Sequence, residues 1–583
     1  MLQLLSRGVI LLLASCLIAC STPTARTTSP ATVRVCWPRD PESLNPIVWP
    51  NTYAVQLNNL LYQSLLVVDG TRRQYVPWLV ENVPQVSRRD SVTAITYRLR
   101  QAAIWDNGQP ITARDVLFTL RLLRCPGVPN ERIGVGLSFI RDIQLDSVDA
   151  RRFTFICNGF APEYATNSGD FPILPEYLLD PKGLLREVPL AELSQSSLSA
   201  GSQRICQAFA EQYNRPEQWR DPQHVRGSGP YELESWQTGQ KLVLRRKATW
   251  WADQLQPAPP MLVARPTRLE FHIIPDPTTA LLALRRGDVD VYPNVPAADF
   301  QRLQNSPQAG QFQFFAPASY RMLVLEMNVQ RPIIRDAATR QALLHLIDVP
   351  ALMRATQNQP ARRTVSIISP LEKWAYNDSL PLRTYAPQRA ASLLRQAGWQ
   401  RTSTTWQRRT ASGKTEELAP RLHYRAGERT LETAALQFQQ AAAKEGIRLT
   451  LLPSEASLLA ELRRKGNYEL VFRTFYGNPF SYDLRQVLHT NSIGVPGGNT
   501  SGFGTKSSDA LLEMIATAED SMQKAKLLRR LQSVLYQEAP LNPLFFEPNR
   551  LIVAKRFADI RPAGPEPGYN LASFSESTPP NKR

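Results

Sequence analysis

The sequence predicts a large α/β protein, and three observations indicate this fold class. Residues 276–290 and 431–452 each read as a helix with an apolar face, a glycine at its end and a following strand. Residues 105–120 read as a tight turn and a capped helix. The chain has 583 residues, of which 43% are hydrophobic, which is enough for two or three domains of ~100–200 residues each.

The turn and helix at residues 105–120 are the sharpest local signal. Asn107-Gly108 permits the positive φ that a tight turn requires. Thr112 and Asp115 have the spacing of a capping box, in which each side chain accepts a hydrogen bond from the other residue's backbone amide. We therefore expect a helix that begins at this threonine.

The first 19 residues predict a targeting segment outside the fold. The apolar run at residues 9–17 is shorter than the ~20 residues that cross a membrane. Cys20 follows Leu17-Ile18-Ala19, which resembles a bacterial lipoprotein signal and implies cleavage before Cys20 and lipidation of its thiol. An ordinary secretory signal is the alternative. Residues 20–32 are rich in Ser, Thr and Pro and predict a flexible tether.

The formal net charge of +17 raises the question of a nucleic-acid partner. The basic residues are scattered along the chain rather than gathered in one stripe. An exported protein also meets little nucleic acid. We therefore expect a solvated basic surface and no nucleic-acid partner.

Four cysteines remain in the body of the chain, at positions 36, 125, 157 and 206. In an oxidising compartment they allow three pairings of two disulfides. A Cys125–Cys157 bond across the glycine-rich stretch 127–136 is one candidate, and free buried thiols are the alternative.

The inventory of chemical groups predicts a binding protein rather than an enzyme. None of the five histidines lies in a zinc-binding spacing, and the chain has no G-x-S-x-G elbow and no phosphate-binding loop. We therefore expect no catalytic residue, no cofactor and no metal ligands. The histidines are His224, His272, His345, His423 and His489.

Trp105-Asp106-Asn107-Gly108 and the following Ile-Thr-Ala-x-Asp-Val string closely resemble a signature of the extracytoplasmic solute-binding proteins of family 5, the peptide/nickel-type ABC importers. Further segments resemble that family's pattern in the same order along the chain. They are Leu44-Asn45-Pro46, 61–65, 77–81, 227–231, Trp250-Trp251, 276–290, 328–348, 385–399, 431–452 and 539–544.

The resemblance implies a two-lobed periplasmic-binding-protein-like fold of type II, of the large cluster C type, with an extra subdomain in lobe I. The two chain crossings between the lobes are expected near residues 268–276 and 537–548. The expected parts are a signal peptide at 1–19, a tether at 20–32, lobe I at 33–60, 176–270 and 545–572, an inserted subdomain at 61–175, lobe II at 271–544 and a disordered tail at 573–583.

The resemblance places a ligand-facing loop after the apolar strand near residue 470. Phe475-Tyr476-Gly477-Asn478 stands where the family often has W-x-x-D, whose aspartate pairs with the terminal amine in peptide binders, so Asn478 departs from that pattern. Asp483 is an alternative amine partner, and Arg473 is a candidate for pairing with a ligand carboxylate. The expected ligand-binding residues are Asn45, Trp105, Tyr231, Trp250, Arg473, Phe475, Tyr476, Asn478, Tyr482 and Asp483.

The family resemblance implies a substrate-binding subunit that captures a peptide or a similar small polar solute between its lobes. Its partners would be the permease and ATPase subunits of an ABC importer. The protein is expected to be a monomer, extracytoplasmic or periplasmic, and held to a bacterial membrane by its lipid. A nickel-chelate or opine-type binder on the same fold and a sensor without transport are the alternatives.

Overall fold

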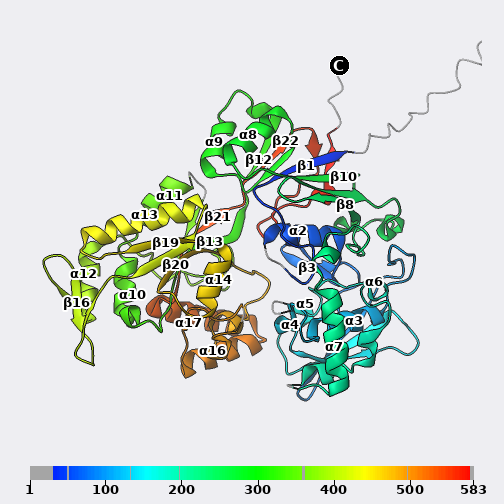
Figure 1. Cartoon of the computed structure of the whole chain (residues 1–583), viewed down its shortest axis with the longest axis horizontal. Helices are drawn as coiled ribbons and strands as arrows, with labels where there is room; N and C mark the ends of the chain where they lie inside the picture. Colours follow the sequence, from blue (N-terminus) through cyan, green and yellow to red (C-terminus); the bar gives the residue numbers. More distant parts are fainter. Residues whose placement is uncertain are drawn as a thin grey trace, which may run out of the picture.

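The computed structural model describes residues 31–48, 51–130, 133–195, 197–357, 361–495 and 497–577. It forms two lobes side by side, each built on its own sheet (Figure 1). Lobe I contains a seven-stranded sheet and an added four-stranded sheet, and lobe II contains a six-stranded sheet. In the part of the chain that the structure describes, no helix is long and apolar enough to cross a membrane.

The seven-stranded sheet has the order β12-β22-β11-β1-β10-β9-β8. Side chains of β1 alternate between its two faces, as the strand period requires. Val33 and Val35 pack in the same cluster as Leu57 of α2, whereas Cys36 packs with Leu284 of α8 on the other face. The elements are β1 (Thr32–Trp37), α2 (Thr52–Leu61), β8 (Tyr231–Gln237), β9 (Lys241–Arg246), β10 (Arg268–Ile273), α8 (Pro277–Arg286), β11 (Val291–Pro293), α9 (Ala297–Gln304), β12 (Phe312–Phe315) and β22 (Leu551–Ala554).

The added sheet of lobe I has the order β4-β5-β7-β6. Its core shares one hydrophobic cluster with α2 and the seven-stranded sheet, so the two parts of lobe I are packed as one body. The elements are β2 (Leu66–Asp69), β3 (Gln74–Pro77), β4 (Gln85–Arg89), β5 (Val92–Arg98), α3 (Ala113–Arg124), α4 (Ile133–Gly136), β6 (Ile140–Leu145), β7 (Arg152–Asn158), α5 (Tyr164–Asn167), α6 (Glu176–Leu179) and α7 (Ala200–Tyr213).

The six-stranded sheet of lobe II has the order β14-β21-β13-β20-β18-β19 and a separate hydrophobic cluster on each face. The elements up to residue 417 are β13 (Ala318–Met327), α10 (Ala337–Leu344), α11 (Val349–Thr356), β14 (Arg362–Arg363), α12 (Pro387–Gln396), β15 (Gln400–Arg401), β16 (Trp406–Arg409) and β17 (Thr415–Glu417). The later elements are β18 (Arg421–Arg425), α13 (Arg429–Lys444), β19 (Thr450–Ser454), α14 (Ala456–Arg464), β20 (Leu470–Tyr476), α15 (Arg485–Leu488), α16 (Lys506–Thr517), α17 (Ser521–Glu538) and β21 (Leu541–Pro548).

The chain crosses between the two main sheets from β12 to β13 and from β21 to β22. The first crossing therefore lies at residues 316–317, not near 268–276, and residues 277–315 belong to the lobe I sheet rather than to lobe II. The sequence pattern of a helix followed by a strand is the same in both lobes, so it does not predict to which lobe the unit belongs. Strand pairing decides its place, because β11 is hydrogen-bonded between β1 and β22.

The end of the chain is more ordered than the sequence suggested. Instead of a disordered tail from residue 573, Ser575 and Glu576 form β24 (Ser575–Glu576). This strand pairs with β23 (Phe557–Ala558), so tertiary pairing orders a polar segment that has no pattern of its own. The proposed signal peptide, Cys20 and residues 578–583 lie outside the described residues.

Several local expectations are confirmed. Helix α3 begins with the capping box, in which the Asp115 Oδ2 accepts from the Thr112 backbone amide at 2.8 Å. Gly229 lies against α2, and a Cβ at this position would come within 2.4 Å of the Leu60 carbonyl oxygen. The four cysteines are free and buried, so the Cys125–Cys157 disulfide is wrong and the free-thiol alternative holds.

Candidate functional site

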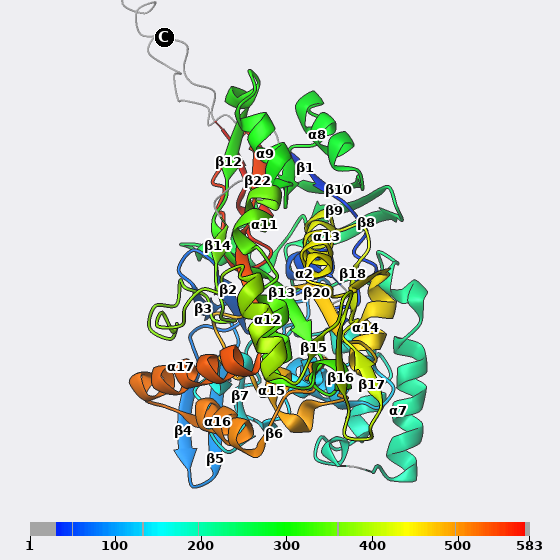
Figure 2. The same cartoon turned by 90° about the vertical axis from the view of Figure 1, so that its left-hand side faces the viewer.

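The two lobes meet through ion pairs along their facing edges. Lys524 of α17 pairs with Glu163, and their side chains are only 8% and 9% exposed. The Arg88 Nη1 lies 2.5 Å from the Glu519 Oε1. Figure 2 shows α17 beside β4 and β5 at this edge. Because the pair is buried only where the lobes touch, removing one partner would leave an uncompensated charge at this contact.

A second set of contacts joins the β2–β3 hairpin of lobe I to lobe II. Arg73 pairs with Glu372, which also accepts a hydrogen bond from the Tyr320 hydroxyl at 2.8 Å. The Tyr75 ring meets the Phe480 ring edge-on, with centroids 5.4 Å apart. The hairpin therefore covers one side of the space between the lobes.

Charged and aromatic side chains from both lobes lie near enough to one another to affect each other's pKa. We call Tyr53, Arg321, Tyr476, Glu547 and Glu566 the interlobe cluster. The Arg321 Nε lies 2.9 Å from the Glu547 Oε2, and Arg321 is the register partner of Tyr476 across β13 and β20. Burial works to lower the pKa of Arg321, but Glu547, Tyr476 and Glu566 raise it above its usual value. The guanidinium is thus held in a strongly negative setting.

Tyr476 is the most informative member of the interlobe cluster. It is 48% exposed, yet desolvation raises its pKa to about 12. The ring is therefore partly accessible while charged groups of both lobes act on it. Such a ring offers a flat apolar surface and one polar hydroxyl to a ligand.

Two carboxylates near Tyr476 have pKa values raised by burial, although one of them, Glu428, also lies 3.6 Å from the Arg425 Nε. Burial raises the pKa of Glu566, against an opposing effect of Arg321. Burial likewise raises the pKa of Glu428, whose Oε1 lies 3.8 Å from the Arg39 Nη2. A cationic group on a ligand would relieve the cost of desolvating these carboxylates.

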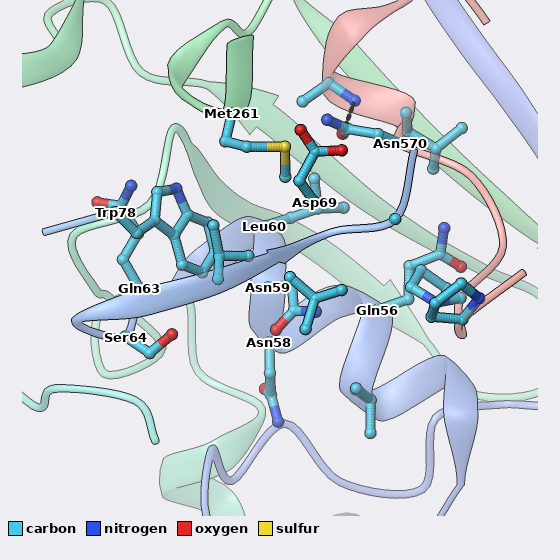
Figure 3. Close-up of a pocket in the computed structure, with 18 of the residues that line it drawn as sticks. Gln56, Asn58, Asn59, Leu60, Gln63, Ser64, Asp69, Trp78, Met261 and Asn570 are labelled. Atoms are coloured by element: carbon cyan, nitrogen blue, oxygen red, sulfur yellow. Dashed lines mark hydrogen bonds between the residues drawn. The ribbon is translucent and has the colours of Figure 1, made fainter. Parts of the chain in front are cut away.

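Lobe I also contains a cavity of about 310 Å³ beside the interlobe cluster. It lies between α2, β2 and the C-terminal segment 561–572 (Figure 3). Glu566 lines the cavity, so this residue belongs to both sites. Within the described ranges, no group of three His, Cys, Asp or Glu side chains is placed to hold a metal ion.

The structure places two of the ten expected ligand residues at these sites, namely Tyr476 in the interlobe cluster and Trp250 in the wall of the cavity. Trp250 also donates from its Nε1 to the Ser228 carbonyl at 3.0 Å, so its role in the wall is combined with a structural one.

Four of the remaining expected residues are engaged within the protein. The Asn45 Oδ1 accepts from the Tyr213 hydroxyl at 2.8 Å. Trp105 is 3% exposed and donates to the Asp115 Oδ1 at 3.2 Å. The Tyr231 hydroxyl donates to the Pro266 carbonyl at 3.0 Å. Arg473 pairs with the fully buried Glu326 rather than facing open space.

The last four expected residues lie in and after β20. The half-buried Phe475 packs against the cluster beneath α16 and α17. The exposed Asn478 accepts from the Phe480 amide at 2.9 Å. The Tyr482 ring contacts that of Trp374 edge-on, and Asp483 pairs with Arg485 at 2.6 Å.

Sequence reasoning missed Tyr53, Arg321, Glu547 and Glu566. Arg321 had a usable signal, because it precedes the apolar run Met322–Leu325, in a strand where a charge is costly without a purpose. Glu566 had none, since it lies in an irregular segment that only the fold brings to the cavity of lobe I.

Comparisons with known proteins agree with this architecture. The family model for bacterial extracellular solute-binding proteins, family 5, matches residues 74–491. The nickel-binding periplasmic protein of Escherichia coli (strain K12) is 24% identical over 544 residues, which cover 91% of this chain and 92% of that protein. The dipeptide-binding protein of the same strain is 21% identical over 540 residues, covering 89% and 90%.

Solved structures show the same fold. The oligopeptide-binding protein AppA from Bacillus subtilis, in complex with a nonapeptide, aligns with a TM-score of 0.74 at 19% identity, covering 94% of this chain and 99% of that one. The family match spans most of the chain and both lobes. The chain therefore belongs to the bacterial extracellular solute-binding proteins of family 5.

Proposed function

We propose that this protein is the substrate-binding subunit of an ABC importer and captures a peptide or a similar small polar solute between its lobes. The observation that carries the proposal is Tyr476, which is half exposed yet desolvated, next to charged groups from both lobes. The names of the dipeptide-binding and nickel-binding relatives support a small polar solute. No bond need be made or broken for this role.

The mechanism follows from the two-lobed geometry. A solute that contacts Tyr53 of lobe I and Tyr476 of lobe II at once gains more when the lobes are together than when they are apart. It can shift the equilibrium only by that difference. Exclusion of water strengthens each polar contact to the solute. Permease and ATPase subunits would then receive the closed form.

The division of the chain that we propose follows the sheets. Lobe I comprises residues 31–315 and 551–577, including the inserted sheet of β4–β7, and lobe II comprises residues 318–548. The two short crossings between them are the proposed hinge. Cys20 is the proposed lipidation site, with residues 1–19 as its signal peptide. The tether to a bacterial membrane, expected at 20–32, ends before Thr32, because β1 begins there.

The experiment that tests the proposal starts from the purified mature protein. Mass spectrometry under native conditions identifies what co-purifies, and thermal-shift titration then compares peptides, glutathione and nickel chelates. A true solute raises the melting temperature with its concentration. We expect Tyr476→Ala to lower the apparent affinity obtained from the titration at least tenfold.

The matched control is Tyr385→Ala, because Tyr385 is similarly exposed, at 40%, but lies outside the interlobe cluster. This variant should bind as the unmodified protein does. Flat melting curves across all three ligand classes, or equal effects of the two tyrosine variants, would contradict the proposal. A shift only with nickel chelates would assign the chelate as the solute.

A further inference from the structure

We propose that the cavity of lobe I is a second binding site, which takes a small organic cation with an ammonium group on an apolar body. All residues that line the cavity come from lobe I. Its volume of about 310 Å³ is within the range of small-molecule sites. The inference concerns this cavity and does not depend on the solute between the lobes.

The charges that line the cavity favour a cation. Asp69, Asp170 and Glu566 contribute carboxylates, whereas Arg561 is the one cationic residue among the described lining residues. Asp69 is already engaged, because it lies 3.7 Å from the Arg72 Nε and accepts from the Thr71 amide at 2.9 Å. The Asp170 Oδ2 accepts from the Tyr75 hydroxyl at 2.7 Å. Within the described chain, Glu566 has neither a hydrogen bond nor an ion pair. The excess of carboxylates would repel an anionic ligand and attract an ammonium group.

The wall of the cavity also holds buried polar atoms without partners in the described protein. They are both amide atoms of Asn58, the Gln63 Nε2, the Tyr62 hydroxyl and the Trp78 Nε1. Each of these residues is at most 6% exposed. These atoms are enclosed by protein, so a ligand in the cavity reaches them only when their side chains turn toward it. Because buried polar groups are normally paired, such a bond would satisfy them.

Apolar surface completes the site and limits the class of ligand. Leu60, Val67, Met261 and Val263 line the cavity together with the Trp78 and Trp250 rings. Figure 3 shows Trp78 and Gln63 toward one end and Asp69 and Asn570 toward the other. A ligand with an apolar body against the Trp78 ring and a cationic end toward Asp69 matches this arrangement.

The test measures binding of benzylammonium chloride to the full mature protein by calorimetry. Benzyl alcohol and benzoate are the neutral and anionic probes of the same shape. We expect benzylammonium to bind at least tenfold more tightly than benzyl alcohol, and benzoate not to bind. Equal affinity for the cationic and neutral probes would overturn the proposal.

Variants locate the bound probe. Glu566→Gln keeps the shape of the side chain and should weaken benzylammonium binding about tenfold, which corresponds to the loss of about 1.4 kcal/mol. The matched control Glu187→Gln makes the same charge change at an exposed lobe I residue outside the cavity and should have no effect.

Val263→Trp fills the cavity and should abolish binding of the cation. If that variant does not fold, a crystal structure with benzylammonium provides the same location. Binding that survives Glu566→Gln unchanged, or density for the probe elsewhere, would refute the site. Glu566 also belongs to the interlobe cluster, whereas Tyr476 does not line the cavity. Tyr476→Ala should therefore leave benzylammonium binding unchanged, and a loss of binding in this variant would place the probe between the lobes and refute the cavity site.

Discussion

Glu326 offers the strongest test of how β20, which leads into the expected ligand-facing loop, is stabilised in lobe II. Its side chain is fully buried in β13 and lies 3.0 Å from the Arg463 Nη2. It also pairs with Arg473 and accepts from the Tyr468 hydroxyl at 2.6 Å. Burial alone would raise its pKa, but Arg473 and Arg463 hold the pKa well below its usual value.

The two arginines themselves are unfavourable neighbours. The pKa of Arg473 is lowered, first by burial and then by repulsion from Arg463. Glu326 therefore stabilises two like charges that lie close together. Glu326→Gln keeps the shape but removes the charge, which leaves both guanidinium groups uncompensated. Removing one partner of a buried ion pair costs about 3–5 kcal/mol.

The assay is urea unfolding followed by tryptophan fluorescence. We expect Glu326→Gln to lower the free energy of unfolding of lobe II by about 3–5 kcal/mol. The control is Glu461→Gln, since Glu461 pairs with Lys465 on the exposed surface of α14 and should show no measurable change. The double variant Glu326→Gln/Arg473→Met should lose less than the sum of its single variants.

The direction in which pH changes the stability contributed by Glu326 follows from its lowered pKa. Because the folded pKa of Glu326 lies below its usual value of 4.5, its contribution is complete above pH 4.5 and is lost as the pH falls below that value. The unmodified protein should thus lose more stability on acidification than Glu326→Gln does. A loss under about 1 kcal/mol at neutral pH, or parallel acid curves, would refute the reasoning.

Three further outcomes are expected. Lys524→Met breaks the buried pair with Glu163 and leaves that carboxylate uncompensated between the lobes, so the lobes should separate and the radius of gyration from X-ray scattering should increase. An unchanged radius would contradict a role for this pair in holding the lobes together. Burial raises the pKa of Asp115 from 3.8 to about 6, so the unmodified protein should lose stability relative to Asp115→Asn as the pH rises between these values; melting curves that stay parallel across this window would argue against it. Gly229→Ala should destabilise by about 2 kcal/mol or more, because the Cβ meets backbone, whereas Gly310→Ala has open space and should be neutral; similar denaturation midpoints for the two would disprove the close approach.

The candidate site shows where sequence reasoning succeeds and where it stops. Tyr476 could be proposed from a loop pattern that the family shares. Its ring is 48% exposed near charged groups of both lobes, and its contact with a ligand stays a prediction. Arg473, only three residues earlier, was an equally plausible ligand contact. Its partner Glu326 lies on a neighbouring strand, and no local pattern reveals that pairing. Residue type indicates which contacts are possible, whereas strand register selects among them.

Helix starts and apolar helix faces could be predicted from the sequence without the tertiary structure. The Thr112–Asp115 capping box and the apolar helices depend on residues near one another in the chain. Three features were decided only by tertiary packing. They are the lobe to which residues 277–315 belong, the absence of a disulfide among the four buried cysteines, and the electrostatic coupling of Arg321 with Tyr53 and Glu566. Short-range hydrogen bonds depend on residues that are close in the sequence and can be predicted from them. Contacts between distant segments depend on which surfaces the whole chain can bury together.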